Sequence, residues 1–304
     1  MSTANAKNVS LVLGSGGARG LAHIGVIRWL EENDFKIKSI VGCSIGAVIG
    51  GIYAAGKLDE YEQWVRSLTK VDIVTLLDPS WEKSGLVRGE KLVNTLIGLV
   101  GEKLIEDLPI SYTAVAADLR GQKEVWIQSG SLFDAMRASF AIPLFFTPFN
   151  YKGVDLVDGG ILNPVPTAPT TGDETDMTIA VNLNGPDENG ICAGTAPESP
   201  SSPFHTKMNR FIGRLQPPVT SGGSQDCGPS EIAIQAFEAM QSAIARQKLA
   251  AYPPDTVIEI PRTACRTLDF DRAAEMIALG HRRAKMCDFS TSPATGKQSM
   301  AGRG

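Results

Sequence analysis

The sequence predicts an α/β protein in which helices pack against a central sheet. Two strand–loop–helix units near the N-terminus carry this prediction. In the first, an apolar run at residues 9–13 precedes a glycine-rich loop at 14–20 and an amphipathic helix that ends near Asn33. In the second, an apolar run at 37–41 leads into a helix at 45–55. Alternating strands and helices build sheets whose strand ends carry chemistry.

The remaining elements continue this alternation. Further helices are expected at residues 61–68, 92–100, 131–139, 230–249 and 271–286. Further strands are expected at residues 112–117, 124–128, 156–158, 177–183 and 257–260, the first two joined by a turn at Gly121. Ser131 followed by Asp134 is typical of a helix N-cap. The proline-containing loop at 76–81 is either an interfacial lid or a loop packed on the core.

We expect one domain over residues 1–304, because 304 residues with 43% hydrophobic content can bury a large core. Its core spans about 9–183. The Pro-, Gly- and Ser-rich stretch at about 184–229 is expected to be a flexible insertion, with a short helix around 204–215. C-terminal helices and a strand follow at 230–289, and a frayed tail at 290–304.

Composition excludes several classes of function. A net charge of −4 without a concentrated basic patch argues against nucleic acid as a partner. The five cysteines include no Cys-x-x-Cys pair, so we expect no metal site and no cofactor.

The N-terminus lacks a secretory signal, which predicts a cytoplasmic protein. The apolar stretch at 40–56 is only marginally long enough to span a membrane, and a buried strand and helix explain it better.

The feature that points most directly to chemistry is Ser44, which lies between Gly42 and Gly46 immediately after the second predicted strand. A G-x-S-x-G segment at a strand-to-helix junction is typical of a nucleophile elbow, in which the serine adopts a strained and exposed conformation. The following helix begins beside the serine, so its unpaired N–H groups would stabilise negative charge there. The pattern alone is only moderately specific.

The glycine-rich loop at 14–20 has two interpretations. A dinucleotide-binding loop would need a third glycine where Arg19 stands, and a phosphate-binding Walker loop would need a lysine after Gly20. The alternative is an oxyanion hole, formed by the consecutive N–H groups of Gly16, Gly17 and Ala18. The neighbouring elbow favours the oxyanion hole.

A nucleophilic serine needs a proton acceptor. Asp158 ends a predicted strand and is followed by Gly159 and Gly160, so it is a candidate base in a Ser-Asp dyad, and partial burial would raise its basicity. His281 offers an alternative, because the order Ser44, Asp158, His281 matches an α/β-hydrolase triad. His23 and His205, the remaining histidines, lie in the first helix and in the insertion.

Together these segments resemble the patatin-like phospholipase family, and in particular its compact bacterial members. The resemblance covers about residues 9–183. Its glycine-rich motif includes Gly14, Arg19 and Gly20 as well as the three oxyanion candidates. Its serine motif stands at 42–46 and its Asp-Gly-Gly motif at 158–160.

The resemblance implies a three-layer α/β/α fold with a mainly parallel central sheet. It also implies calcium-independent hydrolysis of acyl esters in lipids or lysolipids, with Ser44 as nucleophile and Asp158 as base. It leaves room for transient contact with a membrane surface, and for Arg19 to meet either a lipid phosphate or a carboxylate that fixes the loop. Acyl transfer and regulatory lipid binding remain alternatives to hydrolysis. The headgroup, the acyl position and the oligomeric state stay open.

Overall fold

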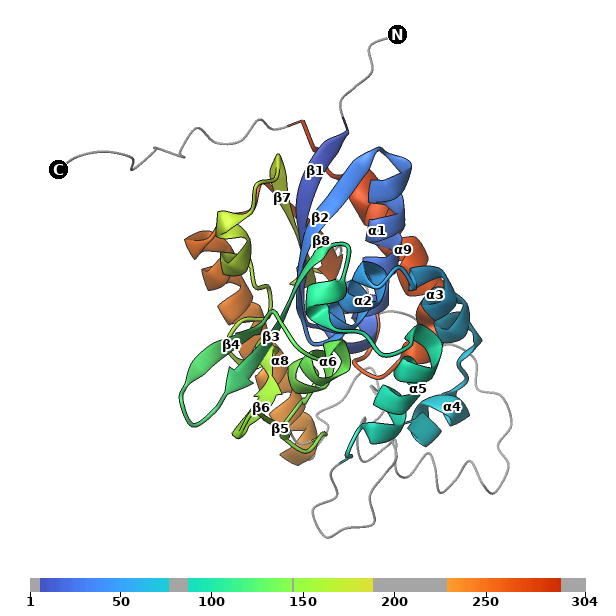
Figure 1. Ribbon diagram of the computed structural model, residues 1–304, viewed down its shortest axis with the longest axis vertical. Coiled ribbons are helices and arrows are strands. Elements are labelled where there is room, and N and C mark those ends of the chain that lie inside the picture. The colour runs from blue at the N-terminus through green and yellow to red at the C-terminus, as the bar shows by residue number, and fades with distance from the viewer. Residues whose placement is uncertain (1–5, 77–86, 144, 188–228, 291–304) are drawn as a thin grey trace, which may run out of the picture.

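The computed structural model describes residues 6–76, 87–143, 145–187 and 229–290. In this part of the chain, the strands form one mixed sheet in the order β5–β6–β3–β2–β1–β7–β8, with β4 also paired to β3 (Figure 1). The strands β3, β2, β1, β7 and β8 are parallel, whereas β4, β5 and β6 pair antiparallel. The strands are β1 Lys7–Leu13, β2 Phe35–Cys43, β3 Ser111–Asp118, β4 Lys123–Ile127, β5 Phe149–Tyr151, β6 Val154–Asp158, β7 Met177–Gly185 and β8 Thr256–Pro261.

Helices connect and cover the strands. The α-helices are α1 Ala22–Glu32, α2 Ile45–Ala54, α3 Leu58–Ser67, α4 Lys70–Leu76, α5 Glu90–Val100, α6 Leu132–Ser139, α8 Pro229–Ala251 and α9 Ala273–Met286. Short 3-10 helices stand at Gly17–Leu21, Ile105–Asp107, Gly159–Ile161, Ala168–Gly172 and Phe270–Arg272. The Gly17–Leu21 turn leads directly into α1, and Gly159–Ile161 follows β6 without a break.

Helices cover both faces of the sheet, so the fold has three layers. On one face, fully buried side chains such as Leu11, Leu13 and Ile40 belong to the large core cluster that α1, α2 and α9 complete. On the other face, Val12 and Val41 pack in a smaller cluster with Ala245 of α8. The alternation of Leu11, Val12 and Leu13 between the two clusters follows from the two-residue period of a strand. Figure 1 shows α8 on the opposite side of the sheet from α1 and α9.

The helices α1 and α9 approach each other closely because each has a glycine at the contact. A Cβ atom on Gly25 would lie 1.9 Å from the carbonyl oxygen of Ile277, and one on Gly280 would lie 1.9 Å from that of Ala22. These distances are far shorter than a van der Waals contact. The C-terminal helix is therefore fixed against the first helix of the chain, although about 250 residues separate them in the sequence.

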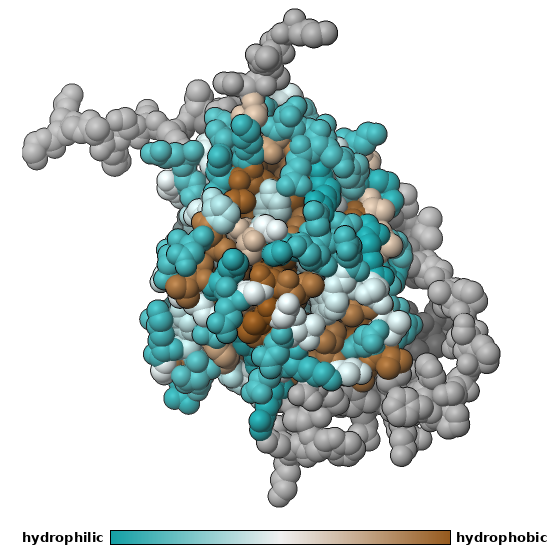
Figure 2. Space-filling view, turned by 45° about the vertical axis from the view of Figure 1, so that its right-hand side comes forward, coloured by the Kyte–Doolittle hydropathy of each residue, from teal (hydrophilic) through white to brown (hydrophobic). Residues whose placement is uncertain are grey.

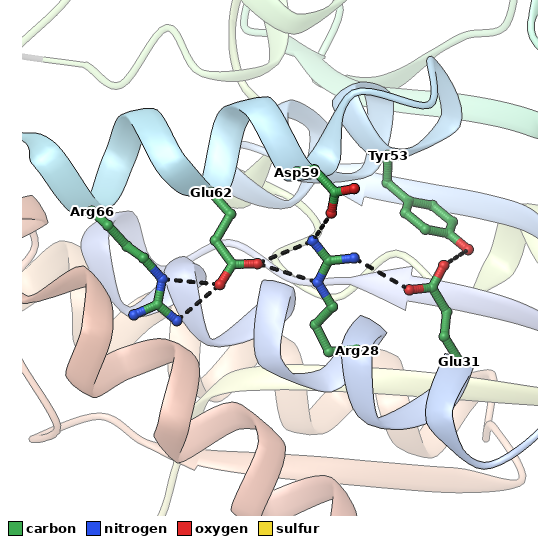
Figure 3. Close-up of polar contacts among 6 residues, drawn as sticks. All are labelled: Arg28, Glu31, Tyr53, Asp59, Glu62 and Arg66. Carbon is green, nitrogen blue, oxygen red and sulfur yellow. Dashed lines mark hydrogen bonds and ion pairs between the residues drawn. The ribbon is translucent and has the colours of Figure 1, made fainter.

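The outer surface beside α1 carries a charged network that links three helices (Figure 3). Arg28 of α1 donates to Asp59 and Glu62 of α3, and Tyr53 at the end of α2 donates to Glu31 of α1 at 3.0 Å. Ion pairs at or near the surface each contribute about 1 kcal/mol or less, so this network adds little to the stability of the fold. Hydrophilic residues predominate over much of the face in Figure 2, with smaller hydrophobic patches between them.

Most predicted elements are confirmed, with bounds shifted by a few residues at most places. Two elements are absent from the sequence prediction, the strand β5 and the short helix α4. The strand predicted at 177–183 extends to Gly185, inside the stretch assigned to the insertion. Most of the loop at 76–81, the short helix at 204–215 and the tail from 291 lie outside the described residues. Residues 40–56 form the end of β2 and then α2, and none of the described helices is long and apolar enough to cross a bilayer.

Candidate active site

The sheet brings the three sequence motifs to one edge. The glycine-rich loop follows the carboxyl end of β1, and Ser44 follows the carboxyl end of the neighbouring parallel strand β2. Asp158 ends β6, which reaches the same level from the opposite direction. In β3, which lies between β2 and β6, Val115 pairs with Cys43 and the next residue pairs with Asp158. Ser44 and Asp158 therefore meet across a single intervening strand.

Ser44 has the backbone conformation of a nucleophile elbow, with φ 56° and ψ −124°. A residue other than glycine rarely adopts a positive φ, and such strain is typical of functional sites. The flanking glycines are required by close contact: a Cβ on Gly46 would lie 2.1 Å from the carbonyl oxygen of Leu13, and one on Gly42 would lie 2.5 Å from backbone atoms of Ala47. The sequence prediction of a sharp turn between β2 and α2 is confirmed, whereas the expectation of an exposed serine is wrong, because Ser44 is 2% exposed.

The carboxylate of Asp158 is 1% exposed and only partly satisfied by hydrogen bonds. Its Oδ1 accepts from the N–H of Gly160 at 2.7 Å and from the thiol of Cys43 at 3.9 Å. Its Oδ2 has no hydrogen-bond partner among the described residues. Burial raises the pKa of Asp158 to about 6, and the nearby polar groups of Ser44, Gly160 and Cys43 lower this pKa by a smaller amount. The Ser44 hydroxyl is thus near the carboxylate without a hydrogen bond of normal geometry, and Oδ2 is left able to accept a proton.

The N–H groups of the glycine-rich loop differ in what they contact. Ala18 donates to the carbonyl oxygen of Thr267 at 2.9 Å, so its N–H is already engaged by the protein. The N–H groups of Gly16 and Gly17 donate to no residue in the described part of the chain. The first residues of the loop are fixed by strand-like bonds, with Ser15 donating to Pro164 at 2.8 Å. Of the three N–H groups expected in an oxyanion hole, those of Gly16 and Gly17 are therefore available to bind an oxygen, and that of Ala18 is not.

Arg19 is buried and turned toward protein acceptors. Its guanidinium donates to the carbonyl oxygens of Arg262 at 3.1 Å and Cys265 at 3.3 Å, and it pairs with Glu238 of α8 at 3.3 Å. The same Glu238 oxygen accepts from the hydroxyl of Thr267 at 3.0 Å. Of the two roles considered for Arg19, the structure shows the ion pair that fixes the glycine loop.

The two described histidines contact groups other than Ser44 and Asp158. His281 lies on α9, partly exposed, and its Nε2 is 2.7 Å from a carboxylate oxygen of Glu32. His23 is fully buried, and its Nε2 is 2.9 Å from the carbonyl oxygen of Gly14. Burial lowers the pKa of His23 to about 4, so this ring is neutral at physiological pH and supports the start of the glycine loop. His205 lies outside the described residues.

A mainly apolar cavity of about 240 Å³ opens beside Asp158 and the glycine loop. Side chains of two segments enclose it, the turn after α6 and the N-terminal half of α8. They include Ile142, Pro143, Phe145, Phe237, Met240 and Gln241. A small apolar cavity with a few polar groups at one end suits an acyl chain whose ester lies beside the polar groups.

Sequence reasoning missed two buried polar residues at this site. Gln241 of α8 is 4% exposed and its amide nitrogen lies 3.3 Å from the hydroxyl of Ser15, whereas the apolar Met240 beside it is 56% exposed. Ser139, at the end of α6, is fully buried, and its hydroxyl accepts the N–H of Ser44. Neither belongs to a motif, so only spatial proximity identifies them. Within the described residues no group of three acidic, Cys or His side chains is arranged to hold a metal ion.

The sequence also matches a known protein family. The sequence pattern of the family described as patatin-like phospholipase matches residues 11–171, which include all three motifs. An uncharacterized NTE family protein of Mycobacterium tuberculosis is 40% identical over 328 aligned positions, covering 91% of this chain and 90% of the relative.

More distant relatives are much longer proteins. Human patatin-like phospholipase domain-containing protein 6 is 30% identical over 190 positions, which cover 60% of this chain and 14% of the human protein. Lysophospholipase nte1 of Neurospora crassa is 26% identical over 91% of this chain and 18% of its own length. Among solved structures, VipD of Legionella pneumophila aligns with a TM-score of 0.45 and 15% identity, over 92% of this chain and 66% of VipD. The family match and the near full-length mycobacterial relative show that the chain belongs to the patatin-like phospholipase family.

Proposed function

We propose that this protein is a serine lipid acyl hydrolase that uses a Ser44–Asp158 dyad. The single observation that carries the proposal is the buried carboxylate of Asp158, which lies beside a strained serine and keeps one oxygen without a partner in the described structure. With its pKa raised to about 6, this group is mostly ionised at neutral pH and is a stronger base than an exposed aspartate.

In the proposed reaction the Ser44 Oγ attacks the ester carbonyl while its proton passes to Oδ2 of Asp158. The carbonyl oxygen becomes negative and is bound by the N–H groups of Gly16 and Gly17, each such donor contributing about 3 kcal/mol. Asp158 then returns the proton to the leaving alcohol, and an acyl-serine remains. Water attacks this acyl-enzyme, gives a proton to Asp158, and the fatty acid leaves as the proton returns to Ser44.

The substrate that the cavity favours is a lipid with one acyl chain. A volume of about 240 Å³ lies below the range that holds drug-sized ligands, so it suits part of a single chain better than two. A lysolipid would meet this limit, and the name of the Neurospora relative is in line with it. We further propose that the protein works at or near a membrane surface, where such lipids are found.

The central test is hydrolysis of a soluble fatty-acyl ester and of a lysophospholipid by the wild-type protein and by Ser44→Ala. The variant should lose hydrolysis and fluorophosphonate labelling while it keeps the wild-type melting temperature. Retained turnover in Ser44→Ala would refute the proposal. Wild-type protein that binds lysolipid without turnover would instead favour regulatory lipid binding, and products formed with added alcohols or thiols would favour acyl transfer.

The dyad is distinguished from a triad by His281→Ala. Because His281 contacts Glu32 on α1, the dyad mechanism predicts that its removal changes kcat by no more than about twofold. A catalytic triad would lose several orders of magnitude, about 10⁴-fold or more. Thermal unfolding of the same variant shows whether any change in rate comes from lost folding.

A further inference from the structure

Ser139 lies directly behind the nucleophile although it belongs to none of the three motifs. It is the last residue of α6 and is 0% exposed. Its Oγ accepts the backbone N–H of Ser44 at 2.9 Å and donates to the carbonyl oxygen of Val115 in β3 at 2.7 Å. A hydroxyl is suited to this place because it donates and accepts at once. Both bonds are buried, so no water can replace them without a rearrangement.

The same segment also holds the other member of the dyad. Two residues after Ser139, the carbonyl oxygen of Ala141 accepts the backbone N–H of Asp158 at 2.9 Å. Ser44 and Asp158 come from different strands, and no backbone hydrogen bond between the two residues is found in the described structure. Residues 139–141 therefore contact the backbone N–H of the nucleophile and that of the base from one short stretch of chain.

The helix α6, which ends at Ser139, is anchored at both of its ends. At its start, Ser131 caps α6 by accepting the N–H of Asp134 at 3.3 Å. In its last turn, the buried Arg137 donates to the carbonyl oxygens of Arg88 at 3.0 Å and Thr147 at 3.0 Å. The guanidinium also lies within 5.6 Å of the ring centre of Phe149. Anchors at both ends of α6 make the position of Ser139 well defined.

We propose that Ser139 is a positioning residue, which holds Ser44 in its strained conformation at the distance that Asp158 requires. This inference rests on the proposed dyad. A serine keeps φ 56° and ψ −124° only when its surroundings impose that conformation. The hydrogen bond from the Ser44 N–H to Ser139, at the end of α6, is one such restraint. Small displacements of a nucleophile cost large factors in rate, about 100-fold for 1 Å.

Three variants test the role, with three measurements on each. Ser139→Ala removes both hydrogen bonds, and Ser139→Thr keeps the hydroxyl. Ser10→Ala is the matched control, because Ser10 is also a fully buried serine with two hydrogen bonds, to Asp173 and Thr175. Ser10 pairs with Ser39 in β2, five residues before Ser44. The measurements are the second-order rate of Ser44 labelling by a fluorophosphonate, kcat and KM for a soluble ester, and the melting temperature.

The positioning role predicts that Ser139→Ala lowers the labelling rate and kcat by about 10- to 100-fold, with KM changed less than threefold. Ser139→Thr should recover most of both rates. Ser10→Ala should lower the melting temperature and leave labelling per folded molecule unchanged. Wild-type labelling in Ser139→Ala, or an equal loss in Ser10→Ala, would overturn the inference while leaving the dyad intact.

Two further outcomes are decisive. If Ser139→Ala does not fold, Ser139→Cys is the second test, because a thiol is only slightly larger than a hydroxyl but is a much weaker donor and acceptor. This variant should show the same loss of labelling, and full labelling would overturn the role. If the wild-type protein neither reacts with the fluorophosphonate nor hydrolyses esters, the proposed function fails and the positioning role fails with it. The wild-type measurement thus separates the two failures.

Discussion

Replacing Asp158 with asparagine should abolish hydrolysis and at the same time reduce the pH dependence of folding stability. The carboxyl is 1% exposed, and burial is the main cause that raises its pKa from 3.8 to about 6. A buried group whose charged form is disfavoured costs free energy in the folded state whenever the solution pH ionises it. The proposed base is therefore expected to destabilise the folded protein at neutral pH.

The sign and size of the effect follow from the two pKa values. Between pH 3.8 and about 6 the unfolded chain has lost this proton and the folded chain retains it, so stability falls as the pH rises through this window. The full cost above pH 6 is about 3 kcal/mol, at about 1.4 kcal/mol for each pH unit, and about 2 kcal/mol of it develops between pH 4 and pH 7. Asparagine does not titrate, so the variant lacks this loss.

Urea unfolding followed by tryptophan fluorescence at pH 4 and pH 7 measures the effect. The free energy of unfolding of Asp158→Asn, minus that of the wild type, should be about 2 kcal/mol higher at pH 7 than at pH 4. Asp187→Asn is the control with the opposite sign, because Thr263 and then Arg262 lower the pKa of Asp187. That variant should lose stability relative to the wild type at pH 7 but not at low pH. A difference for Asp158→Asn that is constant or falls with pH would refute the reasoning.

Three further results are expected. The kcat/KM for an uncharged soluble ester should rise about tenfold from pH 5 to pH 7 as Asp158 ionises, and a flat profile would argue against this base. Gly280→Ala should destabilise the protein by about 1–3 kcal/mol, because the added Cβ would clash with Ala22. In Gly98→Ala the added Cβ would meet no atom within 4 Å, so this variant should stabilise α5 by up to about 1 kcal/mol, and thermal unfolding measures both effects. Arg19→Lys should lower turnover of a phospholipid and of an uncharged ester by the same factor, and a loss confined to the phospholipid would restore a phosphate-binding role.

The start of the parallel sheet could be predicted because the apolar runs of β1 and β2 each lead into a glycine-containing loop or turn. The sequence pattern fails where tertiary contacts outweigh it. β5 has only three residues, two of them partly buried aromatics, and it exists because it pairs with β6. In α8 the helical spacing of Phe237, Met240 and Ile244 indicates an apolar inner face, yet among the described side chains of this helix Gln241 and Ala245 are buried and Met240 is exposed. A helix that covers a polar site needs polar groups on its inner face.

The candidate site residues could be predicted where a residue and its sequence neighbours together indicate one local structure. A serine between glycines after a strand predicts an elbow, and an aspartate before two glycines marks the end of a strand, where a base can lie. Neither Ser139 nor Glu238 has such a signal, because a buried serine or a helical glutamate fits many ordinary roles. Arg19 and Glu238 are 219 positions apart, and only the folded chain shows that they form an ion pair.

The glycine loop is held by contacts with Thr267 and Glu238, so the three motifs do not form a unit that could be transferred by itself. Both partners lie beyond residue 171, where the match to the family pattern ends. A fragment cut after Asp187 would keep Ser44 and Asp158, yet it would leave the Arg19 guanidinium without these acceptors and the Ala18 N–H without its partner. Grafting or truncating this region by motif boundaries would therefore transfer the chemical groups without the scaffold that orients them. In this chain Glu238, Arg262, Cys265 and Thr267 thus help to position the glycine loop of the candidate site, far along the chain from the loop itself.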